Sequence, residues 1–249
     1  MVLDPEERRF FRTVYNAAFA NPFSDLREKL DIKIAGLFPS VSRRESKDLC
    51  INEVALRIRT LERQGRADIN AFHGQDREII TIVFLFDIFH KFRDAFDQLI
   101  KDQIEAGDTP VKVPFAKQVF QMLHARGMEE KSILHHFALS YQLRRAFYFI
   151  STSLVGSSPC MQTLKKQLWY NVFTYNIDHY NKFLWNRMED FSTLILGETG
   201  TGKGTAAKAI GQSGYIPFDD KRQCFTQSFT RAFSSLNLSQ YPETLLESE

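Results

Sequence analysis

With 249 residues, 43% of them hydrophobic and 25% charged, the chain is long enough for one large core or two small ones, and we expect two domains. Thirty-two basic against thirty acidic residues leave a formal charge of +2, which excludes a strong overall field for nucleic acid or for a membrane surface. The three cysteines, Cys50, Cys160 and Cys224, have wide and unpatterned spacing, which argues against a disulfide framework or a metal site.

Targeting signals and membrane-spanning segments are absent from the sequence pattern. The start, Met1 to Arg9, lacks the apolar stretch of a secretory signal. The most apolar window, Ile79 to Phe89, is interrupted by Thr81 and Asp87 and is too short to cross a bilayer as a helix. We therefore expect a cytoplasmic protein with no membrane partner.

Helix start and stop signals follow one another through the first 150 residues. Asp4 and Pro5 open a helix that runs to about Ala20, and Asn21-Pro22 ends it. A turn is expected at residues 38–40. Further helices are expected over residues 24–37, 42–64, 75–105, 115–126 and 131–150. Because strand signals are almost absent, an α-helical bundle is the simplest architecture for this region.

The longest expected helix, residues 75–105, carries an apolar stripe. Its members recur at steps of three and four residues: Ile82, Leu85, Phe89, Phe92, Phe96 and Leu99. Such a stripe either fills the core of the bundle or forms a seam between two copies, and we favour the core. The basic pairs Arg43-Arg44 and Arg144-Arg145 are interpreted as solvated faces or amide-cap neighbours rather than nucleic-acid contacts, because no aromatic interleaving or local excess of charge accompanies them.

A domain boundary is expected at residues 151–159, a small, polar stretch with glycine and proline. It divides the chain into a helical domain, residues 1–153, and a second domain, residues 154–249. An aromatic run between Met161 and Met188 follows, and we expect it to pack against a sheet or against the first domain rather than to stack bases.

A glycine-rich turn in the second domain resembles a phosphate-binding loop. Residues 191–196 predict a short buried strand, and residues 203–210 predict a helix closed by Gly211. Between them, glycines allow a tight turn whose N–H groups point inward, towards the start of the helix. The candidate nucleotide-binding residues are Gly197, Glu198, Thr199, Gly200, Thr201, Gly202, Lys203, Gly204 and Thr205. The expected cofactors are ATP and Mg²⁺, with Lys203 on the β- and γ-phosphates.

The loop departs from the general pattern at one position. Gly204 stands where a serine or threonine usually holds magnesium, and the first hydroxyl after it belongs to Thr205, which is a weak candidate for the metal. The opposing interpretation is a glycine-rich connection between a strand and a helix that binds nothing. The strand, turn and helix context favours the nucleotide loop.

Three segments together resemble the sigma-54-dependent transcription activators, which are AAA+ ATPases of bacteria. They are residues 197–204, the Pro-Glu-Thr-Leu-Leu-Glu-Ser-Glu run at 242–249, and more weakly Gly156 to Met161. In that family the position after the lysine is usually Glu, so Gly204 is unusual there as well. The resemblance implies sigma-54 RNA polymerase as partner, a homo-oligomer, and DNA contact through a carboxyl-terminal domain. It also implies that the first domain is regulatory.

The family's later elements are not found before Glu249, so the sequence resembles a truncated activator. These elements are the GAFTGA loop, the acidic Walker B strand, the sensors and the arginine fingers. The expected fold is therefore a mainly α amino-terminal domain followed by the start of an α/β P-loop (AAA+) domain. No catalytic residue is assigned: we expect ATP binding without hydrolysis by this chain alone. Two alternatives stay open, a non-enzymatic helical interaction module with a vestigial loop, and a small P-loop kinase.

Overall fold

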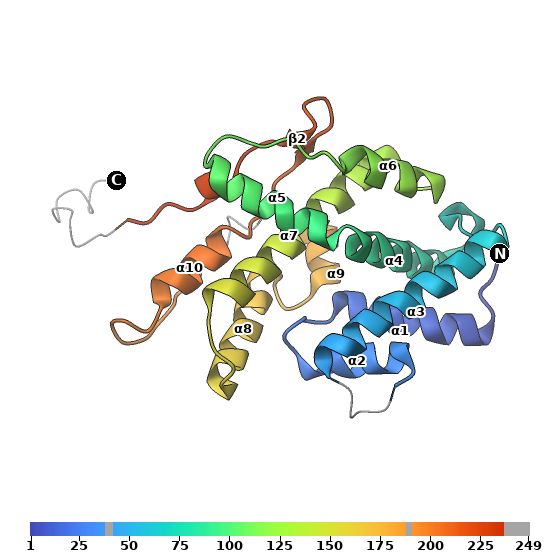
Figure 1. Ribbon diagram of the computed structural model, residues 1–249, viewed down its shortest axis with the longest axis horizontal. Helices are drawn as coiled ribbons and strands as arrows, with labels where there is room; N and C mark the ends of the chain where they lie inside the picture. The colour runs from blue at the N-terminus through green and yellow to red at the C-terminus, as the bar shows by residue number, and fades with distance from the viewer. Residues whose placement is uncertain (38–41, 188–190, 237–249) are drawn as a thin grey trace.

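The computed structural model describes residues 1–37, 42–187 and 191–236, and most of these residues are helical (Figure 1). The turn predicted at 38–40 and the 242–249 motif lie outside this part. The helices are α1 (Pro5–Phe19), α2 (Asp25–Ala35), α3 (Arg43–Arg63), η1 (Ile69–Ala71), α4 (Gly74–Lys91), α5 (Arg93–Ala106), α6 (Ala116–Ala125), α7 (Glu130–Ser153), α8 (Pro159–Val172), α9 (Ile177–His179), η2 (Tyr180–Leu184), α10 (Lys203–Gly211) and η4 (Phe229–Ala232). Two short strands, β1 (Phe218–Asp219) and β2 (Cys224–Phe225), pair antiparallel with Phe218 opposite Phe225.

Side-chain caps form at the starts of several helices. Asp4 accepts hydrogen bonds from the backbone of Glu6 and Glu7, and the Glu7 side chain returns to the Asp4 backbone, which completes a capping box. Ser42 caps α3 and Ser158 caps α8, which has Pro159 in its first turn. These local hydrogen bonds explain why the sequence alone places the helix starts within a residue or two.

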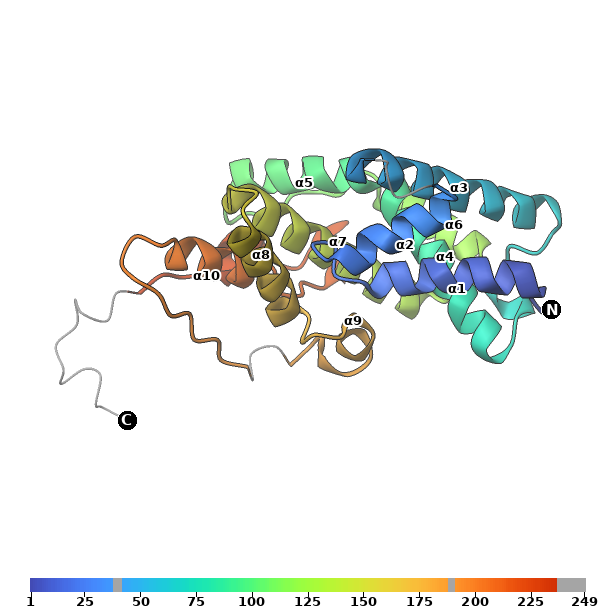
Figure 2. The same cartoon turned by 90° about the horizontal axis from the view of Figure 1, so that it is seen from below.

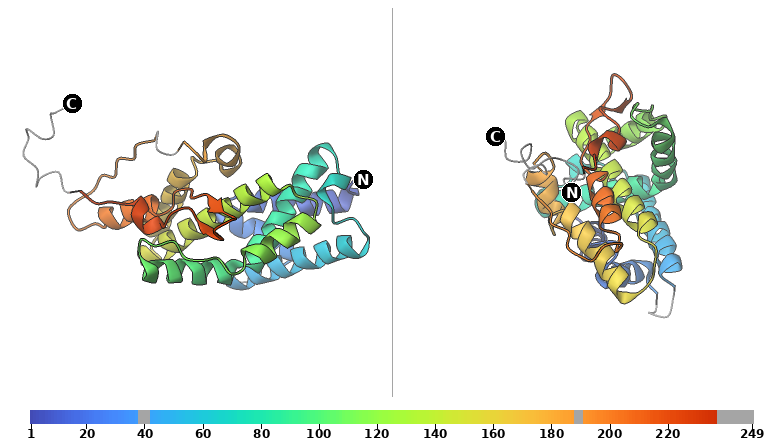
Figure 3. Two further views of the ribbon diagram at one scale, coloured as in Figure 1. Left: turned by 90° about the horizontal axis from the view of Figure 1, so that it is seen from above. Right: turned by 90° about the vertical axis from the view of Figure 1, so that its left-hand side faces the viewer.

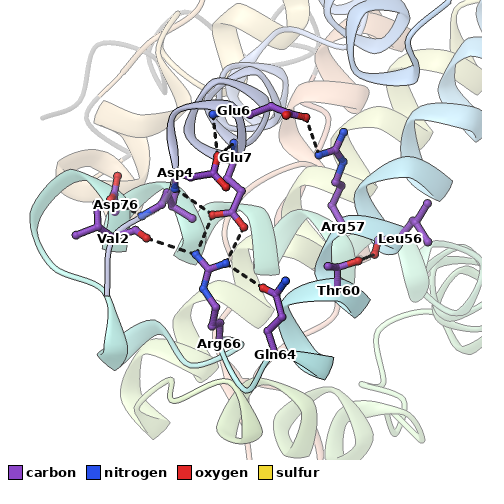
Figure 4. A network of polar contacts seen from close by, with 11 residues as sticks. Val2, Asp4, Glu6, Glu7, Leu56, Arg57, Thr60, Gln64, Arg66 and Asp76 are labelled. Carbon is purple, nitrogen blue, oxygen red and sulfur yellow. Dashed lines mark hydrogen bonds and ion pairs between the residues drawn. The ribbon is translucent and has the colours of Figure 1, made fainter.

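A polar network ties the amino terminus to the bundle (Figure 4). Arg66 binds both carboxylate oxygens of Glu7, at 2.7 and 2.8 Å, and Arg57 contacts Glu6 at 3.3 Å. The backbone N–H of Leu3 donates to the Asp76 carboxylate at 3.1 Å. Because Asp76 belongs to α4, these contacts hold α1 against both α3 and α4.

The single helix predicted over residues 75–105 is wrong: two helices, α4 and α5, meet at Phe92. This residue leaves the α region, with φ −101° and ψ 13°, although it is neither proline nor glycine. The physical reason lies in the partners of the two halves. α4 packs against α1 and α3, whereas α5 packs against α7, and Phe92 stacks on Phe115 at the bend. Tertiary packing therefore overrides the local helical pattern.

The predicted apolar stripe divides at the same bend. Phe92, Phe96 and Leu99 are buried in the core of this chain, as favoured over a seam between copies. The stripe residues on α4, by contrast, are only half-buried: Ile82, Leu85 and Phe89. The buried face of α4 carries Ile79, Ile80, Val83 and Phe84 instead. The amino-terminal half of the stripe thus faces a pocket rather than the centre of the bundle.

The helix α7 connects the carboxyl-terminal elements of the chain to the helical bundle. It contacts α5, α6, α8, α10 and β1, and it runs through the middle of the bundle in both orientations of Figure 3. Figure 2 shows α1 to α4 gathered at one end of the molecule and α8 and α10 at the other. One cluster of buried apolar side chains extends from Leu3 to Phe229 and so joins the two ends. In the described part of the chain, no helix is both long and apolar enough to cross a lipid bilayer.

The strand predicted at residues 191–196 is not formed, although all six of these residues are described. The segment is extended and runs outside the helices (Figure 2). Leu194 and Leu196 are each 81% exposed, and Phe191 is 51% exposed. A parallel strand needs neighbouring strands for its backbone hydrogen bonds and helices on both of its faces. The sheet of the described residues consists of β1 and β2 paired with each other, and residues 191–196 lie outside it.

Candidate functional site

The glycine-rich loop ends at the first residue of α10, as the sequence predicts. Gly202 is the N-cap of α10 and adopts a left-handed conformation, with φ 87° and ψ 18°. Gly200 is also left-handed, with φ 84°. A Cβ at either glycine would meet no other atom, so the backbone conformation rather than space calls for glycine there. Both turns direct the chain into the start of a nine-residue helix.

The ammonium group of Lys203 folds back over this loop. It donates hydrogen bonds to the carbonyl oxygens of Gly197 at 2.9 Å and Glu198 at 2.7 Å. The Thr201 hydroxyl donates to the same Glu198 carbonyl at 2.8 Å. A single cation is thus held at the mouth of the loop by neutral acceptors, and phosphate oxygens are stronger acceptors for an ammonium group than carbonyls are.

The other predicted site residues surround this lysine. Glu198 to Gly202, Gly204 and Thr205 are exposed, and Lys203 itself is half-buried. Thr205 is the third residue of α10, two positions after the lysine. Gly202 gives α10 no side-chain cap, so the first amides of the helix are not used by a side chain of the cap residue. An uncapped helix start beside one lysine is chemically suited to an anion.

Two buried residues of α7, not singled out as functional from the sequence, hold α10 in place. The Arg145 side chain donates to the Gln212 carbonyl at 2.7 Å and to the Gly214 carbonyl at 2.6 Å. Gln142, three residues earlier, donates to the Ser213 carbonyl at 3.0 Å. These carbonyls follow the last turn of α10, where a cation is favoured by the helix dipole. The segment after the glycine-rich loop and α10 is thereby fixed to α7.

The interpretation of Arg144-Arg145 as a solvated pair is wrong. Arg145 is fully buried and its guanidinium lies over the ring of Tyr141, 4.6 Å from the centroid. Arg144 is 9% exposed and forms a two-pronged ion pair with Asp97 of α5. Consecutive arginines on a helix point about 100° apart, so each finds a different partner element. The sequence signal for this burial is that apolar residues lie on several faces of the helix between Phe137 and Ile150.

The aromatic run after residue 161 packs partly against the first helices, as expected. Trp169 contacts Phe23 with ring centroids 6.1 Å apart, and Trp185 contacts His135 at 5.0 Å and Tyr215 at 4.6 Å. His135 also lies within 2.7 Å of the Asn181 side-chain oxygen. These contacts connect the segment that precedes the glycine-rich loop to α7.

The glycine-rich loop lies within a segment that matches a known protein family. Residues 175–249 match the sigma-54 interaction domain. This match confirms the resemblance to sigma-54-dependent activators over the last part of the chain, including the glycine-rich loop and the 242–249 motif. Gly156 to Met161 lies upstream of it, and the division of the chain at residues 153 and 154 stays a prediction. No curated protein and no solved structure matches the chain.

Proposed function

We propose that this chain is an ATP-binding transcriptional regulator of the sigma-54 activator type. The supporting observation is the match to the sigma-54 interaction domain, which contains the loop at 197–205. Within that loop, Gly197, Gly200 and Gly202 offer backbone N–H groups to the phosphates, and Lys203 offers its ammonium group. Glu198, Thr199, Thr201 and Gly204 complete the loop, and Thr205 is the candidate for Mg²⁺ through the nucleotide. Sigma-54 RNA polymerase is the proposed partner, and self-association follows the pattern of complete activators.

The geometry of the lysine supports this assignment. Its hydrogen bonds to the Gly197 and Glu198 carbonyls leave its charge uncompensated by any acid within the described residues. A bound β- or γ-phosphate supplies that compensation. The role assigned to this chain is binding. Hydrolysis additionally requires a metal-holding acid, a water-orienting group and, in most such enzymes, an arginine finger.

The proposal is tested by titrating the chain with a fluorescent ATP analogue in the presence of Mg²⁺. Lys203→Ala removes the main cationic contact, which we expect to weaken binding by on the order of 1.5–3 kcal/mol, or roughly tenfold to more than a hundredfold. Lys208→Ala is the matched control, because Lys208 is an exposed lysine in the last turn of the same helix. Equal affinity of the Lys203→Ala variant and the unchanged chain would refute the nucleotide site.

Two alternatives give different results in the same preparation. A helical interaction module with a vestigial loop binds no nucleotide, whereas its partner binding is unaffected by Lys203→Ala. A small P-loop kinase transfers the γ-phosphoryl group from Mg·ATP to an acceptor, which a phosphoryl-transfer assay detects. In a kinase of that type a hydroxyl normally follows the lysine, so Gly204 argues against this alternative.

A further inference from the structure

A pocket of about 500 Å³ lies among the first helices, away from the nucleotide loop. It is lined from α1, the turn after α1, α2, the start of α3, α4, α7, α8, α9 and η2. Figure 2 shows α1 to α4 side by side at one end of the molecule. Its walls are mostly apolar, with Leu85 and Phe89 from α4 and Leu143 and Phe147 from α7. This volume is within the range of pockets that hold small organic molecules.

The charges around the pocket are strongly one-sided. Its lining contains one acid, Asp31, against five basic residues, Arg27, Arg43, Arg44, Lys47 and Arg144. Asp31 is already paired with Arg27 at 2.8 Å, and Arg144 is paired with Asp97, which lies outside the lining. Arg43 contacts Glu28 at 3.9 Å and donates to the Pro22 carbonyl at 2.8 Å. Arg44 and Lys47 have no ion pair within residues 1–37, 42–187 and 191–236.

These two unpaired cations are positioned together. Arg44 and Lys47 are three residues apart near the start of α3, so they lie on the same face of the helix. The start of a helix carries the positive end of its dipole, where cations are unfavourable. Arg44 is exposed at the rim, whereas Lys47 is half-buried with its ammonium 5.3 Å from the centre of the Phe147 ring. The arrangement concentrates positive charge at one side of an apolar pocket.

The environment of Lys47 is unfavourable for its charge. Burial, and to a smaller extent the neighbouring Arg27, Arg144 and Arg93, together lower the pKa of Lys47 to about 8, against a smaller opposing effect of Asp31. The lysine therefore carries most of its charge at neutral pH in a place that disfavours it. The two histidines of the pocket favour their neutral form. Burial lowers the pKa of His136 to about 4, and it lowers that of His90 as well.

Two further residues of the lining have buried polar atoms without a protein partner. The Nε1 of Trp169, a side chain that is 5% exposed, has no hydrogen-bond acceptor in the described residues. The Nδ1 of His90 has no partner there either. Buried polar atoms are rarely left unpaired in native proteins. Both atoms are shielded from solvent, so they are not counted among the groups that contact a ligand in the pocket.

We propose that this pocket binds a small organic anion with an apolar body. The anionic group is held by Lys47 and Arg44, and the apolar body lies against Leu85, Phe89 and Phe147. Such a molecule supplies the negative charge that the basic cluster lacks and covers apolar walls that are otherwise exposed to water. The site lies in the helical region and does not depend on nucleotide binding, so it extends the proposed function rather than resting on it.

The binding experiment uses decanoate as the probe and the uncharged 1-decanol as its partner of equal chain length. The chain has two tryptophans, so Trp185→Phe leaves Trp169 of the pocket as the sole reporter of fluorescence. We expect saturable quenching or enhancement of Trp169 emission by decanoate. Decanol is expected to bind at least about tenfold more weakly, because it forms no charge-assisted hydrogen bond.

Two variants separate the charge from the apolar body. Lys47→Gln is expected to weaken decanoate binding about tenfold and to leave decanol binding unchanged, because only the charge is removed. Lys101→Gln, on the exposed face of α5, is the control and should change neither affinity. Leu143→Trp fills the apolar part of the pocket and should abolish binding of both probes, with circular dichroism confirming that the helices are kept.

The proposal is overturned if decanoate and decanol bind equally, if neither binding curve saturates, or if Lys47→Gln leaves decanoate affinity unchanged. The Lys47→Gln comparison decides the question even if Leu143→Trp does not fold. The same titration with Lys203→Ala separates the two sites. If that variant loses ATP and keeps decanoate, both assignments stand; if the unchanged chain binds decanoate and no ATP, only the nucleotide assignment fails.

Discussion

Arg145 of α7 donates a 2.7 Å hydrogen bond to the carbonyl oxygen of Gln212, the residue that caps the end of α10. A second nitrogen of the same guanidinium donates to Gly214 at 2.6 Å. Burial lowers the pKa of Arg145 to about 10, so the group still carries its charge at neutral pH. The helix that begins at the glycine-rich loop, α10, is therefore fixed at its far end by one buried cation of α7. Its neighbour on that helix, Arg144, lines the pocket of the first helices.

We expect Arg145→Met to destabilise the chain by roughly 3 kcal/mol, since two carbonyls next to the end of α10 lose a charged donor. Urea unfolding followed by circular dichroism measures this change in the free energy of unfolding. Arg231→Met is the control, because Arg231 is exposed, and we expect its effect to be within about 0.5 kcal/mol. The lower stability of Arg145→Met should be accompanied by faster amide hydrogen exchange in α10. An unchanged urea midpoint for that variant would contradict the anchoring role.

The exposed segment before the loop gives a second prediction. Replacing Leu194 and Leu196 together by Ser should change the free energy of unfolding by no more than about 0.5 kcal/mol, because each side chain is 81% exposed. Leu168→Ser, at a buried position of α8, is the contrasting control and should cost about 2–5 kcal/mol. A loss of that size for the double variant would mean that the segment is a buried strand after all, as the sequence pattern predicts.

Lys47 gives a prediction about alkaline pH. Its pKa is about 8 in the folded chain and close to 10.5 when unfolded, so protonation of the lysine opposes folding below pH 8. Lys47→Met should therefore be more stable than the unchanged chain at pH 7, by on the order of 1–3 kcal/mol. Between about pH 8 and 10.5 the unfolded chain binds more protons than the folded one, so the unchanged chain gains stability and the difference shrinks. Unfolding curves of both proteins from pH 6 to 10 test this, and a difference that is constant or grows with pH would disprove it.

The same titration affects the proposed ligand. An anion beside Lys47 stabilises the protonated lysine, so decanoate affinity should be highest near neutral pH and fall as pH rises through the pKa of the bound state. The charged groups that act on Lys47 are Arg27, Arg93, Arg144 and Asp31. In the Lys47→Gln variant the affinity should be low and independent of pH between 7 and 10.

Asp76 gives a prediction about the free energy of unfolding at acidic pH. Its carboxylate accepts two hydrogen bonds from Arg8 at 2.8 Å and one from the Leu3 backbone at 3.1 Å, and these hold its pKa below the usual value. Asp76→Asn should destabilise the chain by about 1.5–3 kcal/mol at pH 7. Because the folded pKa is lowered, this contribution is complete above the unfolded value and is lost as pH falls below about 4.

The check for Asp76 is the difference in unfolding free energy between the two proteins at pH 7 and pH 3. The difference should narrow at the lower pH. Glu105→Gln serves as the control, because Glu105 is an exposed carboxylate at the end of α5. A difference for Asp76→Asn that is absent at pH 7 would show that the amino terminus is not held by this carboxylate.

Sequence reasoning located the features that depend on neighbouring residues. The helix that Asp4 opens and the helix start at Ser42 arise from hydrogen bonds within a few residues, and the start of α10 at Lys203 follows the left-handed Gly202; the structure confirms all three. The resemblance to sigma-54-dependent activators is equally a property of the sequence, and the family match over 175–249 confirms it. The nucleotide-binding role of residues 197–205 stays a prediction.

The tertiary structure decided the features in which distant segments compete or meet. The break at Phe92 arises because α4 and α5 have different partners, and residues 191–196 form no strand because a strand needs neighbours that no local pattern supplies. The pocket unites side chains from helices far apart in the chain. The buried Arg145 binds the carbonyls of Gln212 and Gly214, which lie 67 and 69 residues later in the sequence. Local hydrogen bonds are determined by adjacent residues, whereas burial is determined by what the rest of the chain brings to a surface, and only the folded chain specifies that.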